Sequence, residues 1–234
     1  YKRQVEDAAY NFAAAYAACF PSPLVGYVTL AVGTSNYEFD DSWTPTTNRE
    51  HGIEWARMIT RLHGRVVALG IEARVVIQGA SNIEADFNSV LNTRAWVDGY
   101  DSVNTRRFYN FGDAGGCSLV SPNNEQLCNN GWRQSDVWYV SWGAGPALPL
   151  PEIYLNNGDH AAQWQKIALY SMLHEFQQMI FPGVMTTWLA CQQVYDEDCP
   201  FIDNTPHQGW TQLLFALNSD ARTFDTLRDW ATGI

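Results

Sequence analysis

The sequence predicts an α/β fold and, within that class, a (β/α) barrel of the TIM type with irregular or missing units. Short segments rich in β-branched residues alternate with longer amphipathic ones, which is the pattern of parallel strands covered by helices. The chain has 234 residues, 46% of them hydrophobic and 17% charged, enough to bury one sizeable core. No repeat, linker or low-complexity segment divides it, so residues 1–234 are expected to form a single domain.

The first half of the chain predicts helices and strands in strict alternation. An Ala-rich segment over residues 4–18 predicts a helix, because Ala has the highest helix propensity. A β-branched segment over 27–33 predicts a strand, and 51–69 predicts a helix because its apolar residues fall on one face. A second β-branched run, 73–79, predicts another strand, and 89–100 predicts the helix after it.

The second half continues the pattern less regularly. Residues 107–111 and 136–142 are rich in aromatic and β-branched residues and predict two strands. Residues 149–154 predict a short fifth strand, although its prolines argue against a strand, and 183–190 predict a sixth. A helix is expected over 159–174. The amphipathic segments of the tail are 209–218 and 223–230.

Strands in this order fit a barrel, and an open doubly wound sheet is the alternative. No Gly-x-Gly-x-x-Gly motif follows the first strand, so nothing favours a dinucleotide-binding fold. No phosphate-cradling loop is present, and we expect no cofactor. The histidines show no metal-ligand spacing, and His174-Glu175 lacks the second His of a zinc-protease helix, so we expect no metal site.

The composition limits the partners and the compartment. The net charge of −11 and the absence of a Lys/Arg cluster argue against nucleic acid as a partner. No run of about 18 apolar residues is present, so no membrane span is expected. The sequence starts at Tyr1 without an initiator Met or a signal-peptide pattern, so we expect that residues upstream were removed or left out. The sequence does not predict an oligomeric state.

Two pairs of cysteines each bracket a short polar loop. Cys117 with Cys128 and Cys191 with Cys199 are expected to form local disulfides, although two pairs of unlinked thiols would give the same sequence. Disulfides persist in oxidising compartments, so a secreted or cell-surface protein is expected. Cys19 has no obvious partner.

The most informative segment covers residues 75–87. It begins as a β-branched strand and then presents Asn82, Glu84 and Asp86 at alternate positions, so their side chains point the same way on an extended backbone. Enzymes with parallel strands keep their catalytic residues at the C-terminal ends of these strands. The alternative interpretation is a solvated acidic turn or a helix N-cap.

Carboxylates, amides and aromatics follow the other predicted strands as well, an inventory typical of glycosidases. Glu84 and Glu152 are the preferred catalytic pair, with Asp86 and Asp113 in reserve; each carboxylate could instead be a cap or a surface charge. The residues expected to bind substrate are Asn36, Asn82, Asn110, Trp142, Tyr154, Trp188 and Gln192. Ser141 and Thr187 follow strands at the same edge.

Three segments resemble a known group of proteins. Gly79–Phe87, Thr93–Tyr100 and Val137–Gly143 are similar to segments of secreted bacterial proteins with a glycoside-hydrolase-like barrel, distant relatives of the family 25 muramidases. In that family a strand-end Asp-x-Glu carries the catalysis. The corresponding tripeptide Asn82-Ile83-Glu84 keeps the Glu and replaces the Asp by an amide. The resemblance implies an incomplete barrel and a glycan substrate such as peptidoglycan.

Two functional hypotheses follow. The first is a secreted glycoside hydrolase acting on a polysaccharide, with Glu84 as acid or base, Glu152 as its partner, and Trp142, Tyr154 and Trp188 lining the sugar site. The second is a non-catalytic extracellular protein that keeps the barrel for carbohydrate binding or for assembly at a cell surface.

Overall fold

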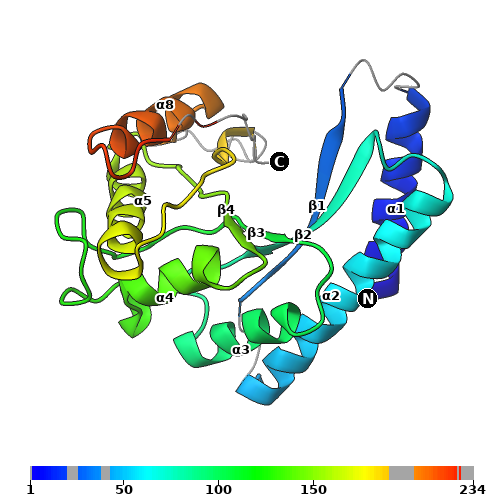
Figure 1. Ribbon diagram of the computed structural model, residues 1–234, viewed down its shortest axis with the longest axis horizontal. Helices are drawn as coiled ribbons and strands as arrows, with labels where there is room; N and C mark the ends of the chain where they lie inside the picture. The colour runs from blue at the N-terminus through cyan, green and yellow to red at the C-terminus, as the bar shows by residue number, and fades with distance from the viewer. Residues whose placement is uncertain (1, 20–25, 38–42, 190–202, 226, 228–234) are drawn as a thin grey trace.

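The computed structural model describes residues 2–19, 26–37, 43–189, 203–225 and 227, which build one mixed α/β domain. Its centre is a four-stranded parallel sheet, with each strand hydrogen-bonded to the next one along the chain (Figure 1). The strands are β1 (Val28–Ser35), β2 (Val75–Asn82), β3 (Phe108–Asn110) and β4 (Ala147–Pro149).

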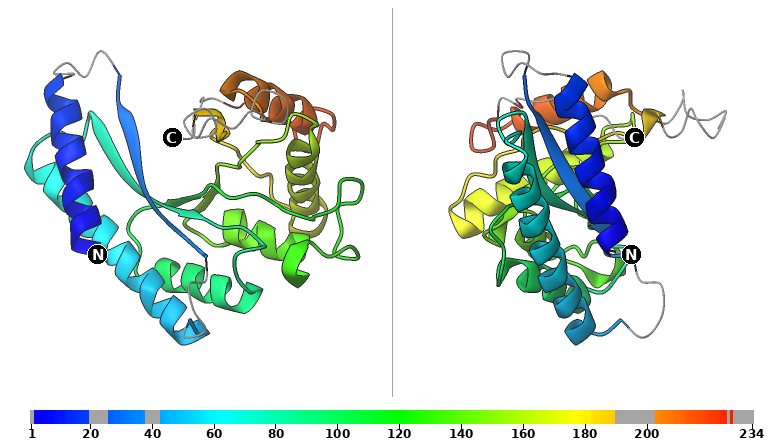
Figure 2. Two further views of the ribbon diagram at one scale, coloured as in Figure 1. Left: turned by 180° about the vertical axis from the view of Figure 1, so that it is seen from behind. Right: turned by 90° about the vertical axis from the view of Figure 1, so that its right-hand side faces the viewer.

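Helices flank the sheet at both ends. Helices α1 and α2 lie side by side along β1 and β2, whereas α5 and α8 pack together at the other end of the molecule (Figures 1 and 2). The helices are α1 (Lys2–Cys19), α2 (Pro45–Ala68), α3 (Val90–Asp101), α4 (Gln134–Trp138), α5 (Asp159–Tyr170) and α8 (Pro206–Leu217). The short turns are η2 (Asn129–Gly131), η3 (Tyr139–Gly143) and η4 (Ser171–Glu175).

One face of the sheet is sealed by helices. The register aligns Val32, Gly79, Phe108 and Ala147 across the four strands, and all four residues are buried. The rings of Trp96 and Tyr100 in α3 pack on Phe108, and the hydroxyl of Tyr100 occupies the space left by the missing side chain of Gly79. The neighbouring register row, which faces the other way, is more open: Gly33 is exposed, and Tyr109 and Leu148 are partly so.

Helices α2 and α3 touch backbone to backbone. A Cβ added at Gly52 would collide with the carbonyl oxygen of Trp96, and one at Gly99 would collide with the carbonyl oxygen of Arg49. These reciprocal glycines let the two helices approach closely above the sheet. The contact brings Trp96 to the indole–imidazole hydrogen bond with His51, 3.1 Å long.

Most of the expected elements are confirmed, with shifted ends. The helix expected over 51–69 begins at Pro45 because Thr44 accepts a hydrogen bond from the backbone of Thr47 and the Thr47 hydroxyl oxygen accepts one in return, which closes a capping box. The predictions confirmed in this way are 4–18, 27–33, 51–69, 73–79, 89–100, 107–111, 159–174 and 209–218.

The strand predicted over 136–142 is wrong, because this segment forms α4 and the wide turn η3. Its buried residues, Val137, Val140, Ser141 and Ala144, recur at helical spacing, and the Asp136 carboxylate accepts a hydrogen bond from the backbone N–H of Arg133 at the start of the helix. The aromatic run between them favours a strand by composition only. The fourth strand is β4 instead, which begins two residues before the strand predicted over 149–154 and shares only Pro149 with it.

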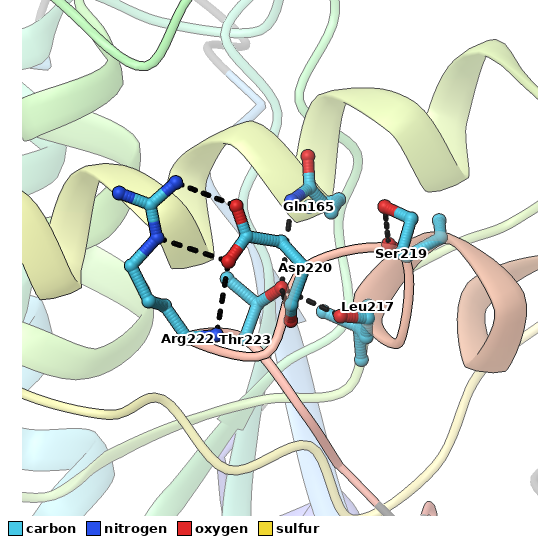
Figure 3. Close-up of polar contacts among 7 residues, drawn as sticks. Gln165, Leu217, Ser219, Asp220, Arg222 and Thr223 are labelled. Carbon is cyan, nitrogen blue, oxygen red and sulfur yellow. Dashed lines mark hydrogen bonds and ion pairs between the residues drawn. The ribbon is translucent and has the colours of Figure 1, made fainter.

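The predicted strand over 183–190 is reduced, within the described residues, to a single parallel bridge between Met185 and Glu152. Of the predicted helix over 223–230, the described residues 223–225 and 227 form no helix. The tail is held by a turn instead: Thr223 donates to the Leu217 carbonyl and accepts a bond from Gln165 of α5, and Arg222 pairs with Asp220 (Figure 3). No helix in the described part of the chain is long and apolar enough to cross a membrane.

Replacement of Gly99 by Ala should separate α2 from α3 and lower the free energy of unfolding by about 2 kcal/mol or more, because the new methyl group meets backbone rather than a movable side chain. The matched control is Gly64→Ala in α2, where the position is exposed and no heavy atom lies within 4 Å of the added Cβ. That substitution should stabilise the protein by up to about 1 kcal/mol through helix propensity. Denaturant unfolding measures both values, and equal effects would contradict the close helix crossing.

Candidate active site

The C-terminal edge of the sheet is fastened by two buried amides. Asn36, just after β1, accepts a hydrogen bond from the backbone N–H of Glu84 at 3.1 Å and donates one to the Glu84 carbonyl at 3.0 Å. The same Nδ2 donates to the hydroxyl of Thr93 in α3. Asn36 therefore fixes the backbone that carries Glu84, and both functions of its amide are engaged in doing so.

Asn110 at the end of β3 does the same for the neighbouring residues. Its Oδ1 accepts hydrogen bonds from the backbone N–H groups of Ile83, at 3.2 Å, and Gly112, at 3.0 Å. Its Nδ2 donates to the hydroxyl of Ser141 in η3, and the residue is 0% exposed. A Cβ at Gly112 would collide with the backbone of Ile83, so only glycine allows the ends of β2 and β3 to meet this closely.

Glu84 projects from this edge beside Asn82. The Asn82 amide donates a 2.8 Å hydrogen bond to the Glu84 carboxylate, while Asn82 Oδ1 is buried and has no hydrogen-bond partner among the described residues. Burial raises the pKa of Glu84 to about 7; the Asn82 bond opposes this rise, and the negative charges of Asp113 and Asp86 add to it. Glu84 is therefore partly protonated near neutral pH.

Glu152 enters the same edge from beyond β4. Its backbone N–H donates to the Gly112 carbonyl, and its pairing with Met185 extends the sheet by one bridge. The side chain is 5% exposed, and Oε2 has no hydrogen-bond partner in the described part of the protein. Burial raises its pKa to about 9, with further contributions from the charges of Glu84 and Asp113, so the carboxyl keeps its proton at neutral pH.

Two aspartates complete the cluster. Asp113 follows β3 and accepts a 3.0 Å hydrogen bond from the backbone of Gly115, and Asp86 is exposed and accepts one from the side chain of Asn129 at 2.8 Å. Burial raises the pKa of Asp113, the Gly115 bond and the charge of His160 oppose the rise, and the charge of Asp86 adds to it. The charges of Asp86 and Asp113 act on Glu84, and those of Glu84 and Asp113 act on Glu152, so the four carboxyl groups form one chain of electrostatic neighbours.

His160 belongs to this neighbourhood and was missed by the sequence prediction. It lies in the first turn of α5, its Nδ1 accepts a hydrogen bond from the backbone N–H of Tyr154, and its ring packs edge-on against that of Tyr154. Burial lowers its pKa, while the charge of Asp113 acts in the opposite direction. It follows β4 by eleven residues, so no strand-end pattern in the sequence points to it.

The remaining predicted residues lie elsewhere or outside the described residues. Trp142 is on η3 rather than at a strand end and packs against the hydrophobic core, so the basis of its predicted sugar-binding role is gone. Trp188 is half-buried, and the hydroxyl of Thr187 lies 3.4 Å from the carboxylate of Asp203. Gln192, together with the predicted pair Cys191 and Cys199, falls outside the described residues.

The predicted disulfide between Cys117 and Cys128 is confirmed, and both cysteines are buried. It closes the loop that leaves the sheet at Asp113 and returns at Asn129, whose backbone N–H donates to the Gly115 carbonyl. The disulfide therefore supports the residues that hold Asp86 and Asp113. It is compatible with an extracellular protein, and Cys19 is free and exposed.

Within the described residues, no group of three or more His, Cys, Asp or Glu side chains has the arrangement of a metal site. The carboxyl groups of Glu84, Asp113 and Glu152 influence one another through charge. What the arrangement can provide is proton transfer, since it places a carboxyl that retains its proton near another that is partly ionised.

Comparison of the chain with protein-family models, curated proteins and solved structures found no match to any of them.

Glu152 should make stability depend on pH. Its pKa is about 9 in the folded protein against 4.5 for an ordinary Glu. The protonated carboxyl therefore makes its full contribution to the free energy of unfolding below pH 4.5, and this contribution is lost as the pH rises toward 9. Glu152→Gln cannot ionise and should gain stability relative to the wild type between pH 5 and pH 8, on the order of 3 kcal/mol. Urea unfolding at several pH values measures this difference. Glu54→Gln, an exposed carboxylate on α2, should show no such trend, and a flat difference for Glu152→Gln would contradict the buried, protonated carboxyl.

Loss of the disulfide should loosen the loop beside the acidic cluster. The double substitution Cys117→Ser with Cys128→Ser should lower the free energy of unfolding by about 2–4 kcal/mol, because the unfolded chain regains the freedom of the open loop. Cys19→Ser is the control and should have little effect, since this thiol is free and exposed. Peptide mapping without reductant should recover Cys117 linked to Cys128 and also tests the Cys191–Cys199 pair; free thiols at 117 and 128 would contradict the linkage.

Proposed function

We propose that the protein is a secreted glycoside hydrolase that cleaves a polysaccharide of a cell wall or extracellular matrix. The observation that carries the proposal is Glu152, a buried carboxyl on which the charge of Glu84 acts and whose Oε2 has no hydrogen-bond partner among the described residues. Glycoside hydrolysis needs one carboxyl that donates a proton to the leaving oxygen and a second that acts as base or nucleophile.

The two glutamates divide these roles by their surroundings. Glu152, with a pKa of about 9, retains the proton that the leaving group requires. Glu84, with a pKa of about 7, is partly ionised at neutral pH and can act as base or nucleophile. The Asn82 amide and the Asn36 clamp hold Glu84 in place, so the carboxylate is positioned before the substrate arrives.

The strand order supports an incomplete (β/α) barrel as the scaffold. Sequential parallel neighbours, β1 to β4, are the order of a barrel, whereas a doubly wound sheet reverses its order at a switch point. The acidic cluster lies at the C-terminal ends of these strands, where barrel enzymes place their sites. The resemblance to relatives of the family 25 muramidases agrees with this scaffold and suggests a peptidoglycan-like glycan.

A non-catalytic carbohydrate-binding protein is the second candidate, and Asn82 is the observation that favours it. The resemblance places a catalytic acid at this position, and the chain carries an amide that is hydrogen-bonded to Glu84. If Glu84 needs an acid on its own strand, the site binds glycans without cleaving them.

Hydrolysis of a panel of cell-wall and extracellular polysaccharides distinguishes the two candidates. The wild type should hydrolyse at least one glycan, and Glu84→Gln and Glu152→Gln should each lower kcat/KM by about 100-fold or more, because each removes a proton-transfer group. Glu54→Gln, an exposed position on α2, is the matched control and should retain full activity. Undiminished hydrolysis by both site variants would refute the assignment, and glycan binding without hydrolysis by the wild type would favour the binding protein.

A further inference from the structure

We infer that the site takes a polycationic glycan, one built from sugars with free amino groups, and that an ammonium group of this glycan binds at Asp86 and Asp113 beside Glu84. The inference rests on the proposed function, because it names the substrate class of the same site. It differs from that proposal in predicting which of two otherwise equal glycans the protein prefers.

The negative charges of the carboxyl cluster are not compensated by neighbouring cations among the described residues. The described ion pairs lie elsewhere, on α1, α2, α3 and α4 and in the turn after α8, and none of them includes Glu84, Asp86, Asp113 or Glu152. The charges that act on Glu84 and Glu152 are all negative. Among the described residues, the positive charge that acts on Asp113 is that of His160, and burial disfavours the protonated form of this ring. A bound cation would relieve the mutual repulsion.

Several polar atoms of the cluster have hydrogen-bonding capacity that the described residues do not use. Glu152 Oε2 and Asn82 Oδ1 are buried and lack partners in the described part of the chain, and buried polar atoms are normally satisfied. Asn82 Oδ1 can only accept, because the amide donates through Nδ2 to Glu84. The described hydrogen bonds engage one oxygen each of Asp86 and Asp113. Glu152, which keeps its proton, can itself donate, but Asn82 Oδ1 and the free oxygens of Asp86 and Asp113 can only accept. A group that binds beside them must supply donors, and an ammonium supplies three with a full positive charge.

An ammonium group fits this cluster better than a hydroxyl, an acidic sugar or a divalent cation does. A neutral hydroxyl would satisfy hydrogen bonds but leave the carboxylate charges uncompensated, and a uronic or sulfated sugar would be repelled by them. A divalent cation needs ligands that converge, and the described residues form no such group. The net charge of −11 also attracts a polycation toward the protein. An N-acetylated sugar offers one N–H and no charge, so it is the informative comparison.

The experiment compares a β-1,4-linked glucosamine hexamer with its fully N-acetylated counterpart by calorimetry and by hydrolysis. The wild-type protein should bind the amino form at least about tenfold more tightly, and added NaCl should narrow the difference. Asp86→Asn and Asp113→Asn should each weaken binding of the amino form several-fold and leave the acetylated form unchanged. Asp220→Asn is the matched control, since it removes one negative charge from the exposed turn after α8, where Asp220 pairs with Arg222 (Figure 3). Near-UV circular dichroism checks the fold of each variant.

Equal affinity for the two hexamers, or preference for the acetylated one, overturns the inference and leaves the proposed function standing if any glycan is hydrolysed. An equal loss in Asp220→Asn also overturns it, because the preference would then reflect overall charge. If neither hexamer binds but another glycan of the panel is cleaved, the inference alone fails. If no glycan binds or is cleaved, the proposed function fails first.

Discussion

The candidate site depends on the hydrogen bonds that two asparagines make to backbone where parallel strands stop pairing. At the ends of β2 and β3 the ladder of backbone hydrogen bonds runs out, and buried N–H groups without partners would be costly. Asn36 and Asn110 replace the ladder by supplying a carbonyl to Glu84, Ile83 and Gly112. Because a neutral amide both donates and accepts, it closes the edge without adding a charge. A carboxylate there would accept the same N–H groups but could not donate to the Glu84 carbonyl or to Ser141.

This closure is what allows carboxyl groups to stand close together. Asn36 holds the backbone of Glu84, and the backbone N–H of Gly115 holds the side chain of Asp113, so these bonds oppose the electrostatic repulsion between the strand ends. The repulsion and the burial then appear as raised pKa values of Glu84, Asp113 and Glu152. Raised carboxyl pKa values weaken the folded state as the pH rises, and sites that retain such groups commonly do so for function. The disulfide between Cys117 and Cys128 helps to oppose this repulsion, because it closes the loop between Asp113 and Asn129.

Local patterns predicted the parts of the fold that local patterns control. The β-branched runs of β1 and β2 and the Ala-rich α1 were predictable from the sequence, and so was the placement of Asn36, Asn82, Glu84 and Asn110 at strand ends. The direction of an amide was not predictable. Asn36 and Asn110 were expected to face a ligand, and instead they hold backbone, because the register decides which groups lack partners. The strand predicted over 136–142 was wrong because its aromatic composition favours a strand while its apolar spacing favours a helix. The expected place of Trp142 at a strand end was wrong for the same reason. The contact of His160 with Tyr154 was not predictable either, because it depends on where the first turn of α5 packs.

The structure gives Asn82 a physical role that the tripeptide Asn82-Ile83-Glu84 alone does not reveal. As a donor to the Glu84 carboxylate, it favours the ionised form and moves the pKa of Glu84 down, away from that of Glu152. An aspartate at this position would add a fifth carboxyl group to the cluster and move the pKa of Glu84 up. On the proposed assignment, the proton donor is therefore supplied by a different strand end, and the amide keeps the two glutamates distinct in protonation. Asn82 Oδ1 accepts no hydrogen bond from the described residues, so on the proposed assignment it can accept one from a donor on the ligand.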